Sequence, residues 1–256
     1  MQSQYILPQE LEHPPIEDAA FEICFQPAPG GTSDRVQAVL RSALGIEYPR
    51  SESVPAQPPP DRFRSIAADP RHQPKLRLFG SGAMLLIGDG AVRVRIGAPY
   101  PGWDALHARI DAVLDTLEQS GAVGAVERIS LRFVNILRDV PPRQLEALRV
   151  DLRVNGEAAP ETGLQLRVEL SDERYVRVVE IQPGASGPML QADRDAHGLM
   201  LALECRRDLA GGAFWPERRE LLENLHFELR ALFFRLLQRA QIDKLGPIYR
   251  KPPSEG

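Results

Sequence analysis

The chain has 256 residues, of which 43% are hydrophobic and 26% charged, and its formal net charge is −4. This composition is typical of a globular protein and excludes an intrinsically disordered chain. The negative charge argues against a protein whose main task is to neutralise a phosphate backbone, so nucleic acid is not an expected partner. The length fits one large domain or two small ones.

The cysteines and the N-terminal residues limit which metal or cofactor chemistry and which cellular location we expect. Cys24 and Cys205 lie in expected strands without a cysteine or histidine at metal-ligand spacing, so we expect buried thiols, no metal and no cofactor. The opening MQSQYILPQELEHPP lacks a basic segment followed by an apolar run, and no apolar stretch has membrane-spanning length. These features predict a soluble cytoplasmic protein with no membrane partner.

The first half, residues 1–140, predicts a proline-containing arm followed by strands and two helices. Phe21, Ile23 and Phe25 alternate with polar residues, which indicates a half-buried strand. Residues 49–61 are rich in proline and serine and predict a loop. The other predicted elements are a helix that starts at Thr32 or Ser33 and ends at Gly45, strands over 62–68, 75–79, 84–88 and 91–97, a helix from Trp103 to Gly121, and a strand over 127–137.

The second half, residues 141–256, is richer in strands and ends in a helix. Its apolar residues recur at alternating three- and four-residue steps over 218–241, the longest periodic run in the chain. We therefore expect the core to be organised around this helix. The other predicted elements are a helical turn over 143–148, strands over 150–154, 164–170, 175–181 and 199–207, and connections over 181–188 and 191–198.

Strands that follow one another through tight turns favour antiparallel pairing over a parallel sheet. The order of elements therefore predicts an α+β fold. We expect antiparallel sheets packed against a few helices, in two similar half-units, residues 1–140 and 141–256, with a long C-terminal helix.

A polar seam interrupts the apolar surface of the last helix. Glu223, His226 and Arg230 lie on neighbouring turns between two apolar ridges. One interpretation is a buried structural histidine whose ring is satisfied by Glu223. The other is a ligand-binding or proton-transfer group, because histidine titrates near neutral pH.

Arginines on strand faces form the second candidate site. Guanidinium groups mixed with carboxylates suit an anionic small molecule, a peptide carboxylate or a nucleotide. The alternative is a solvated sheet face of paired charges. The residues expected to share this face are Arg93, Arg95, Arg132, Arg167 and Arg177, with Glu22, Glu169 and Glu204.

The sequence contains no motif of a known catalytic type. The glycine-rich turns lack the strand-to-helix context and the lysine of a phosphate loop, and there is no G-x-S-x-G turn. The five histidines never pair at helical metal spacing. A triad assembled in space stays open, although nothing in the sequence supports one.

Two motifs bracket the chain: Pro15, Ile16, Glu17, Ala20, Phe21, Glu22 and Ile23 near its start, and Leu225, His226, Phe233, Leu245, Gly246 and Pro247 near its end. Together these motifs resemble those of a sporadically distributed bacterial family of uncharacterised proteins. That family has a proline-containing arm before a strand, a Leu-His pair in the last helix and a closing Leu-Gly-Pro. The resemblance implies the fold and a bacterial source, in a mobile gene neighbourhood such as a defence or accessory biosynthetic cluster, and it brings no catalytic residue.

We therefore expect a non-enzymatic binding or regulatory component. Its partner would be a protein or a small anionic ligand, and a homodimer is a further expectation. The alternative is an enzyme or a nucleotide- or anion-binding effector that uses the seam together with the sheet arginines. The residues predicted to bind a ligand are Arg93, Arg95, Arg132, Arg167, Glu204, Glu223, His226 and Arg230.

Overall fold

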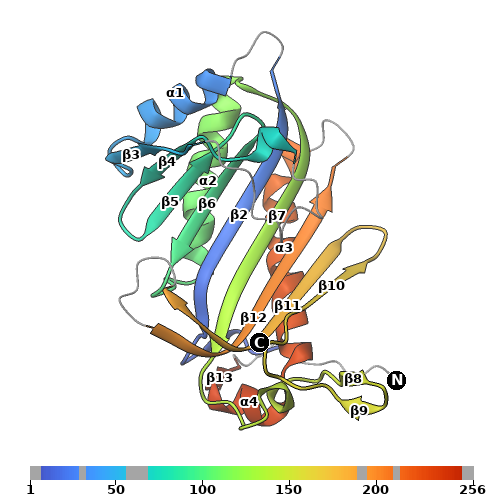
Figure 1. The fold of residues 1–256 in the computed structure, drawn as a ribbon. Coiled ribbons are helices and arrows are strands. Elements are labelled where there is room, and N and C mark those ends of the chain that lie inside the picture. Colours follow the sequence, from blue (N-terminus) through green and yellow to red (C-terminus); the bar gives the residue numbers. More distant parts are fainter. Residues whose placement is uncertain (1–6, 29–32, 56–68, 189–194, 210–213, 250–256) are drawn as a thin grey trace, which may run out of the picture.

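The computed structural model describes residues 7–28, 33–55, 69–188, 195–209 and 214–249. One antiparallel sheet of nine strands dominates it, with helices packed on one face (Figure 1). The predicted α+β class is confirmed. The principal elements are β2 (Ile16–Pro27), α1 (Ser33–Leu44), β3 (Arg50–Ser53), β4 (Leu76–Phe79), β5 (Ala83–Ile87), β6 (Ala91–Gly97), α2 (Trp103–Ser120), β7 (Val123–Leu137), β10 (Leu166–Ser171), β11 (Val176–Pro188), β12 (Asp195–Asp208) and α3 (Phe214–Leu236).

Short elements complete the described chain. Two 3-10 helices, η2 (Pro70–His72) and η3 (Gln144–Ala147), lie in connections, and α4 (Arg239–Lys244) follows α3. Two small two-stranded sheets pair β1 (Glu10–Leu11) with β13 (Pro247–Ile248), and β8 (Arg153–Val154) with β9 (Glu157–Ala158). Among the described residues no helix has the length and apolarity required to cross a membrane.

The sheet has the order β10-β11-β12-β7-β2-β6-β5-β4-β3, which is nearly symmetric about the β7–β2 pair. Each side has a long central strand, then strands that meander back toward it from the edge of the sheet, then a helix. β2 leads to β3, β4, β5, β6 and α2 on one side, and β7 leads to β10, β11, β12 and α3 on the other. This topology gives two similar half-units within one sheet, one from β2 to α2 (Ile16 to Ser120) and the other from β7 to α3 (Val123 to Leu236). Whether residues 1–140 and 141–256 act as separate domains stays a prediction.

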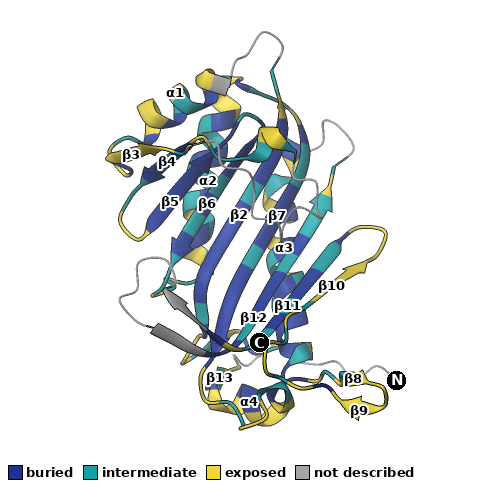
Figure 2. Cartoon of the chain, in the orientation of Figure 1, coloured by how far each residue is buried: buried dark blue, intermediate teal, exposed yellow. Residues whose placement is uncertain are grey.

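The core lies between the sheet and helices α2 and α3 (Figures 1 and 2). Phe21, Ile23 and Phe25 of β2 are completely buried there, as their alternation predicts. In α3, Leu222 and Leu225 are also completely buried. Both half-units contribute to this single apolar cluster, so the helices and both sets of strands stabilise one another.

Three segments predicted as loops or connections contain strands. Residues 50–53, expected in a loop, form β3 because they pair with β4. The expected connection 181–188 instead lies in β11, and residues 195–198 of the expected connection 191–198 begin β12. The pairing of these two strands continues past an irregularity between Gln182 and Ala185. The predicted strand over 62–68 lies outside the described residues.

The last helix is shorter than its periodic sequence suggests. α3 ends at Leu236, and a separate helix begins at Arg239. Leu237 forms a β-bridge with Leu148, and the amide of Gln238 donates to the carbonyl of Ala147 at 2.9 Å. Competing hydrogen bonds from the segment after η3 therefore end the helix at this point. The predicted strand over 150–154 is reduced to the two residues of β8.

Burial in α3 predicts a large difference between neighbouring positions. Leu225 has no exposed surface, whereas Phe227 is 56% exposed. Leu225→Ala should lower the free energy of unfolding by about 2–5 kcal/mol, because it leaves a cavity in the core. Phe227→Ala is the matched control and should change it by less than about 0.5 kcal/mol. Chemical denaturation measures both, and equal effects would show that α3 is peripheral to the core.

Candidate functional site

A cavity of about 750 Å³ opens on the helix-covered side of the sheet. The N-terminal arm, the start of α2, strands β7 and β12, and α3 form its walls. Polar and apolar groups alternate in this lining, which is common in small-molecule sites. The aromatic and polar residues of the lining are Tyr100, Trp103, Phe133, His226, Phe233 and Phe234, with Gln9, Glu10, Asp104, Asn135, Glu223 and Arg230.

The seam predicted from the sequence lies in this cavity, but its internal contacts differ from the prediction. Glu223 does not satisfy His226. Instead, Glu223 Oε1 accepts a hydrogen bond of 3.2 Å from Trp103 Nε1. The Trp103 indole stacks on the His226 imidazole, with ring centroids 4.0 Å apart and an angle of 10° between planes. The seam of α3 therefore holds an aromatic residue of α2 flat against the histidine.

His226 is uncharged at neutral pH. Burial lowers its pKa to about 4, helped by the positive charge of Arg230 and by His107. Within the described chain its ring nitrogens form no hydrogen bond, so its contacts are the stacked Trp103 and the edge of Phe133, 6.3 Å between centroids. A neutral ring with free nitrogens can give or take one hydrogen bond with a bound molecule.

Arg230 links the cavity to the N-terminal arm. Its Nε and Nη2 atoms donate to the carbonyl of Pro8 at 3.0 and 2.6 Å. Burial lowers the pKa of this guanidinium. No carboxylate of the described residues forms an ion pair with it, so a backbone carbonyl is the acceptor it contacts. Partly buried cations usually have an anionic partner, and this one is therefore available to an acceptor group on a ligand.

The arm is a built wall of the cavity. Gln9 and Glu12 donate through their amides to Ile248 and Gly246 at 2.8 and 2.9 Å, extending the β1–β13 pair. Gly246 has φ of +64°, and a Cβ there would lie 2.8 Å from Glu12. Glycine is therefore needed where the C-terminal segment meets the arm. At the other end of the arm, the carbonyl of Pro15 accepts from the amide of Ile136 at 2.9 Å.

Tyr100 contributes a buried hydroxyl that has no hydrogen-bond partner among the described residues. Burial raises the pKa of this phenol, with a smaller contribution from Asp104. Its ring meets Phe133 edge-on at 5.8 Å between centroids. A buried polar atom without a partner is costly, so this hydroxyl marks a position where a ligand would supply one. The sequence prediction missed Tyr100, Trp103 and the arm, although the Tyr-Pro-Gly-Trp run before α2 was a visible signal.

The other predicted site residues lie on the opposite face of the sheet and do not converge on the cavity. Each arginine among them forms an ion pair with a carboxylate of that face, within its own strand for Arg167 and across strands for the others. Arg93 pairs with Glu22, Arg95 with Asp18 at 2.6 Å, Arg132 with Glu180 at 2.7 Å, and Arg167 with Glu169 at 2.7 Å. This arrangement is a sheet face of paired charges, which was the alternative interpretation to an anion-binding site.

Glu204 and Arg177 take different places in this arrangement. Glu204 lies 3.9 Å from Arg132 on the charged face, and burial raises its pKa despite the neighbouring arginines. Arg177 is on the other face, where it donates to Glu228 of α3 at 2.9 and 2.7 Å. Its grouping with the sheet arginines was wrong. Arg177 lies on the same face of the sheet as the buried Tyr175, whereas Glu180 lies on the charged face.

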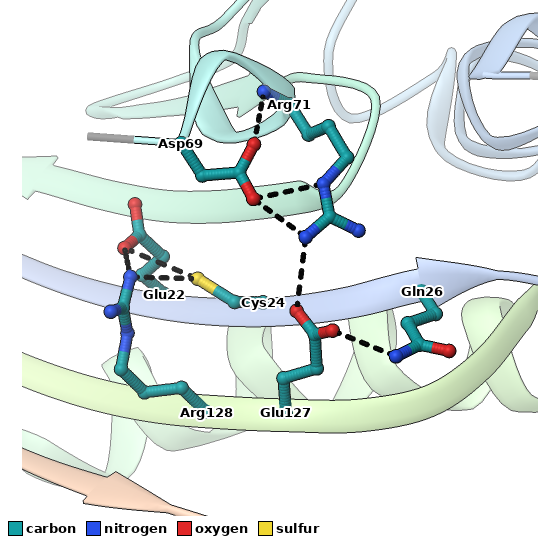
Figure 3. A network of polar contacts seen from close by, with 7 residues as sticks. All are labelled: Glu22, Cys24, Gln26, Asp69, Arg71, Glu127 and Arg128. Atoms are coloured by element: carbon teal, nitrogen blue, oxygen red, sulfur yellow. Dashed lines mark hydrogen bonds and ion pairs between the residues drawn. The ribbon is translucent and has the colours of Figure 1, made fainter. Parts of the chain in front are cut away.

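A second part of the charged face joins η2 to the central strands (Figure 3). Arg71 holds Asp69 at 2.6 Å and approaches Glu127 to 3.7 Å. Next to it, the thiol of Cys24 lies 3.6 Å from Glu22 and 3.3 Å from Arg128. Burial raises the pKa of this thiol to about 12, so it is not a thiolate at neutral pH. The described residues contain no cluster of side chains suited to a metal ion.

Comparison of the chain with protein-family models and with curated proteins finds no match. The cavity is therefore interpreted from its own geometry, and membership of the bacterial family stays a prediction.

The lowered pKa of His226 predicts a pH-dependent stability. The unfolded histidine titrates near 6.5 and the folded one near 4, so the unfolded chain binds more protons between these values. Stability should fall as pH drops through this window, by up to about 1.4 kcal/mol per pH unit.

His226→Gln removes this titration and keeps a hydrogen-bonding side chain of similar size. Its unfolding free energy should therefore depend less steeply on pH between about 6.5 and 4. Glu204 contributes an opposite slope that both proteins share, so it cancels in the difference. Denaturation at a series of pH values measures the two slopes, and identical slopes would contradict the lowered pKa.

The charged face predicts structural effects of arginine substitution. The carboxylate side chain of Asp18 is only 7% exposed, so Arg95→Ala would leave it without its cation. We expect a loss of about 1–3 kcal/mol, partly recovered when Asp18→Asn is added. Arg153→Ala is the control, because Arg153 and its partner Asp151 are 61% and 73% exposed. It should cost less than about 0.5 kcal/mol in the same denaturation experiment.

Proposed function

We propose that this protein is a non-enzymatic binding component, and that its cavity takes a small, flat organic molecule carrying one hydrogen-bond acceptor group. The observation that carries the proposal is the cavity itself, of about 750 Å³, in which an indole, a phenol and a neutral imidazole lie around one partly buried arginine. Cavities of this size and mixed lining bind drug-sized ligands.

The aromatic residues support a flat ligand. Trp103 and His226 form a preorganised stack, and Glu223 holds the indole in that position. Tyr100 and Phe133 provide a second aromatic pair in the same lining. Rings that are already held in place lose little conformational entropy when a ligand stacks on them.

The charges support one acceptor group, such as a carboxylate or a carbonyl. Arg230 is the cation of the described lining, and its Nη1 atom has no described partner. Three exposed carboxylates, Glu10, Asp104 and Glu223, belong to the same lining. They would repel a ligand with several negative charges, which argues against a nucleoside polyphosphate.

The regulatory part of the proposal rests on the arm. Arg230 holds the carbonyl of Pro8 and also faces the cavity, so an acceptor on the ligand competes with the arm for the same guanidinium. Ligand binding would then loosen or rearrange residues 8–16. A protein that recognises this segment would sense occupancy of the cavity, as expected of a component of an accessory gene cluster.

The alternative, an enzyme or a nucleotide-binding effector, has less support from the geometry. It requires Arg93, Arg95, Arg132 and Arg167 to act with the seam, and these arginines lie on the opposite face in ion pairs. The described lining residues include no serine, threonine, cysteine or lysine that would serve as a nucleophile. Stacking and hydrogen bonding are the interactions on which the binding proposal rests.

The experiment is a binding screen with an internal fluorophore. The chain has two tryptophans, so Trp215→Phe leaves Trp103 as the reporter. Aromatic monocarboxylates and their neutral amides should change its fluorescence and raise the melting temperature, whereas nucleoside triphosphates should not. Arg230→Gln should weaken the best carboxylate by about tenfold or more, as expected for loss of a charge-assisted hydrogen bond.

Phe227→Ala is the control, because this residue is exposed on α3 and does not line the cavity. It should leave affinity unchanged. If no member of the screen binds, or if binding is equal in Arg230→Gln and wild type, the proposed function is wrong.

A further inference from the structure

The edge strand β10 has an alternating sequence but no buried face. Leu166, Val168 and Leu170 alternate with polar residues, which predicts one apolar face against a core. Val168 is nevertheless 37% and Leu170 46% exposed, and the whole strand is intermediate or exposed (Figure 2). Exposed apolar side chains on a free sheet edge are typical of a surface that pairs with another strand.

The symmetry of the sheet explains why this face is bare. In the first half-unit the corresponding strand is β4, whose Leu76 and Leu78 are 4% and 1% exposed, and α1 packs beside α2 on that side. In the second half-unit, η3 and the β8–β9 hairpin stand in the chain where α1 stands in the first. The second half-unit therefore has no described helix beside α3 that would cover β10, and β10 forms the edge of the sheet in Figure 1.

Hydrogen bonding in the adjacent hairpin sets which backbone groups of β10 face outward. The amide of Asp172 donates to the carbonyl of Tyr175 at 3.0 Å, and the register then runs residue by residue to Leu166 opposite Ile181. Alternate residues of an antiparallel strand bond to the same neighbour. Val168 and Leu170 therefore point their backbone groups at β11, whereas Arg167 and Glu169 point theirs outward.

We propose that two copies of this chain form a dimer by antiparallel pairing of their β10 strands, centred on Val168. In this register Val168 lies opposite Val168 of the second copy, and Leu166 lies opposite Leu170. On the other face Arg167 lies opposite Glu169. Apolar residues meet apolar residues and opposite charges meet at both ends, so the strand is complementary to itself.

Charge complementarity selects both the occupant and the register. Centring the pair on Arg167 would place two arginines opposite each other, and centring it on Glu169 would oppose two carboxylates, which is destabilising. The side chains of Arg167 and Glu169 are 36% and 39% exposed, so both can reach a second copy. Within one chain they pair with each other, and they also lie 3.4 Å from Glu180 and 3.2 Å from Arg206, respectively. The dyad is perpendicular to the sheet, and the two sheets would join edge to edge with their helices on the same side.

A disulfide experiment tests the register. Val168→Cys places a cysteine opposite itself in a non-hydrogen-bonded pair, where Cα atoms are about 4.5 Å apart, within disulfide range. Leu170→Cys is the control, because the same register separates the two copies of this residue by about 13 Å. Cys24 and Cys205 are buried and do not compete. Under mild oxidation Val168→Cys should migrate as a covalent dimer and Leu170→Cys as a monomer.

Charge reversal tests the occupant. Wild-type protein should sediment with an increasing share of dimer as its concentration rises. Arg167→Glu and Glu169→Arg should each sediment as monomers, since each brings like charges together. An equimolar mixture should form a heterodimer, because every pair across the dyad is then of opposite charge. Wild type and both variants should keep the same fluorescence response of the cavity, whose lining includes no residue of β10.

Three results would overturn the dimer. They are a wild-type chain that stays monomeric at every concentration, equal cross-linking of Val168→Cys and Leu170→Cys, and a mixture of the charge variants that fails to associate. If the wild-type chain is monomeric, the occupant of the β10 edge would instead be a strand of another protein.

Discussion

The pairing of β2 with β7 at the centre of the sheet is the interaction on which the rest of the structure depends. These two strands come from different half-units, and their register runs from Ile16 opposite Asn135 to Pro27 opposite Val123. Each of the two strands is followed in the chain by its own meander of strands and its own helix, which lie on its side of the β2–β7 pair. Because both strands send apolar side chains into one core, neither helix would be fully covered without the other half. The cavity exists for the same reason, since it lies where the arm before β2 meets the helix that follows the other meander.

The sequence predicted the type of most elements, and missed features that depend on contacts remote along the chain. Alternation in β2 and periodicity in α3 each follow from burial of one face, so a local pattern reveals them. The end of α3 at Leu236 depends on the segment after η3, far away in sequence. The glycine-containing stretch from Gly184 to Gly187 reads as a loop, yet it is held in β11 by pairing with the first residues of β12.

The candidate site was predictable in part for the same physical reason. Glu223, His226 and Arg230 belong to one helix, so their spacing alone brings them together. Trp103, Tyr100 and Pro8 come from two other segments, and only the fold places them beside the seam. The face on which Arg177 lies could have been predicted from the sequence, since it alternates in step with the apolar residues Tyr175, Val179 and Ile181. The other four sheet arginines share one face, as their alternation predicts, but their pairing with particular carboxylates depends on the strand order.

The lattice of ion pairs on the open face has a consequence for how the sheet selects its register. Apolar alternation repeats every two residues, so a strand that slides by two positions against its neighbour still sends its apolar side chains into the core. The charges do not repeat in this way. Sliding β6 by two residues in one direction would bring Arg95 opposite Glu22 and separate Asp18 from the cation it now holds. Sliding it in the other direction would bring Arg93 opposite Ala20 and leave Glu22 opposite Ala91, without its cation. Burial therefore chooses the face of each strand, and the ion pairs distinguish the correct alignment from its nearest competitors.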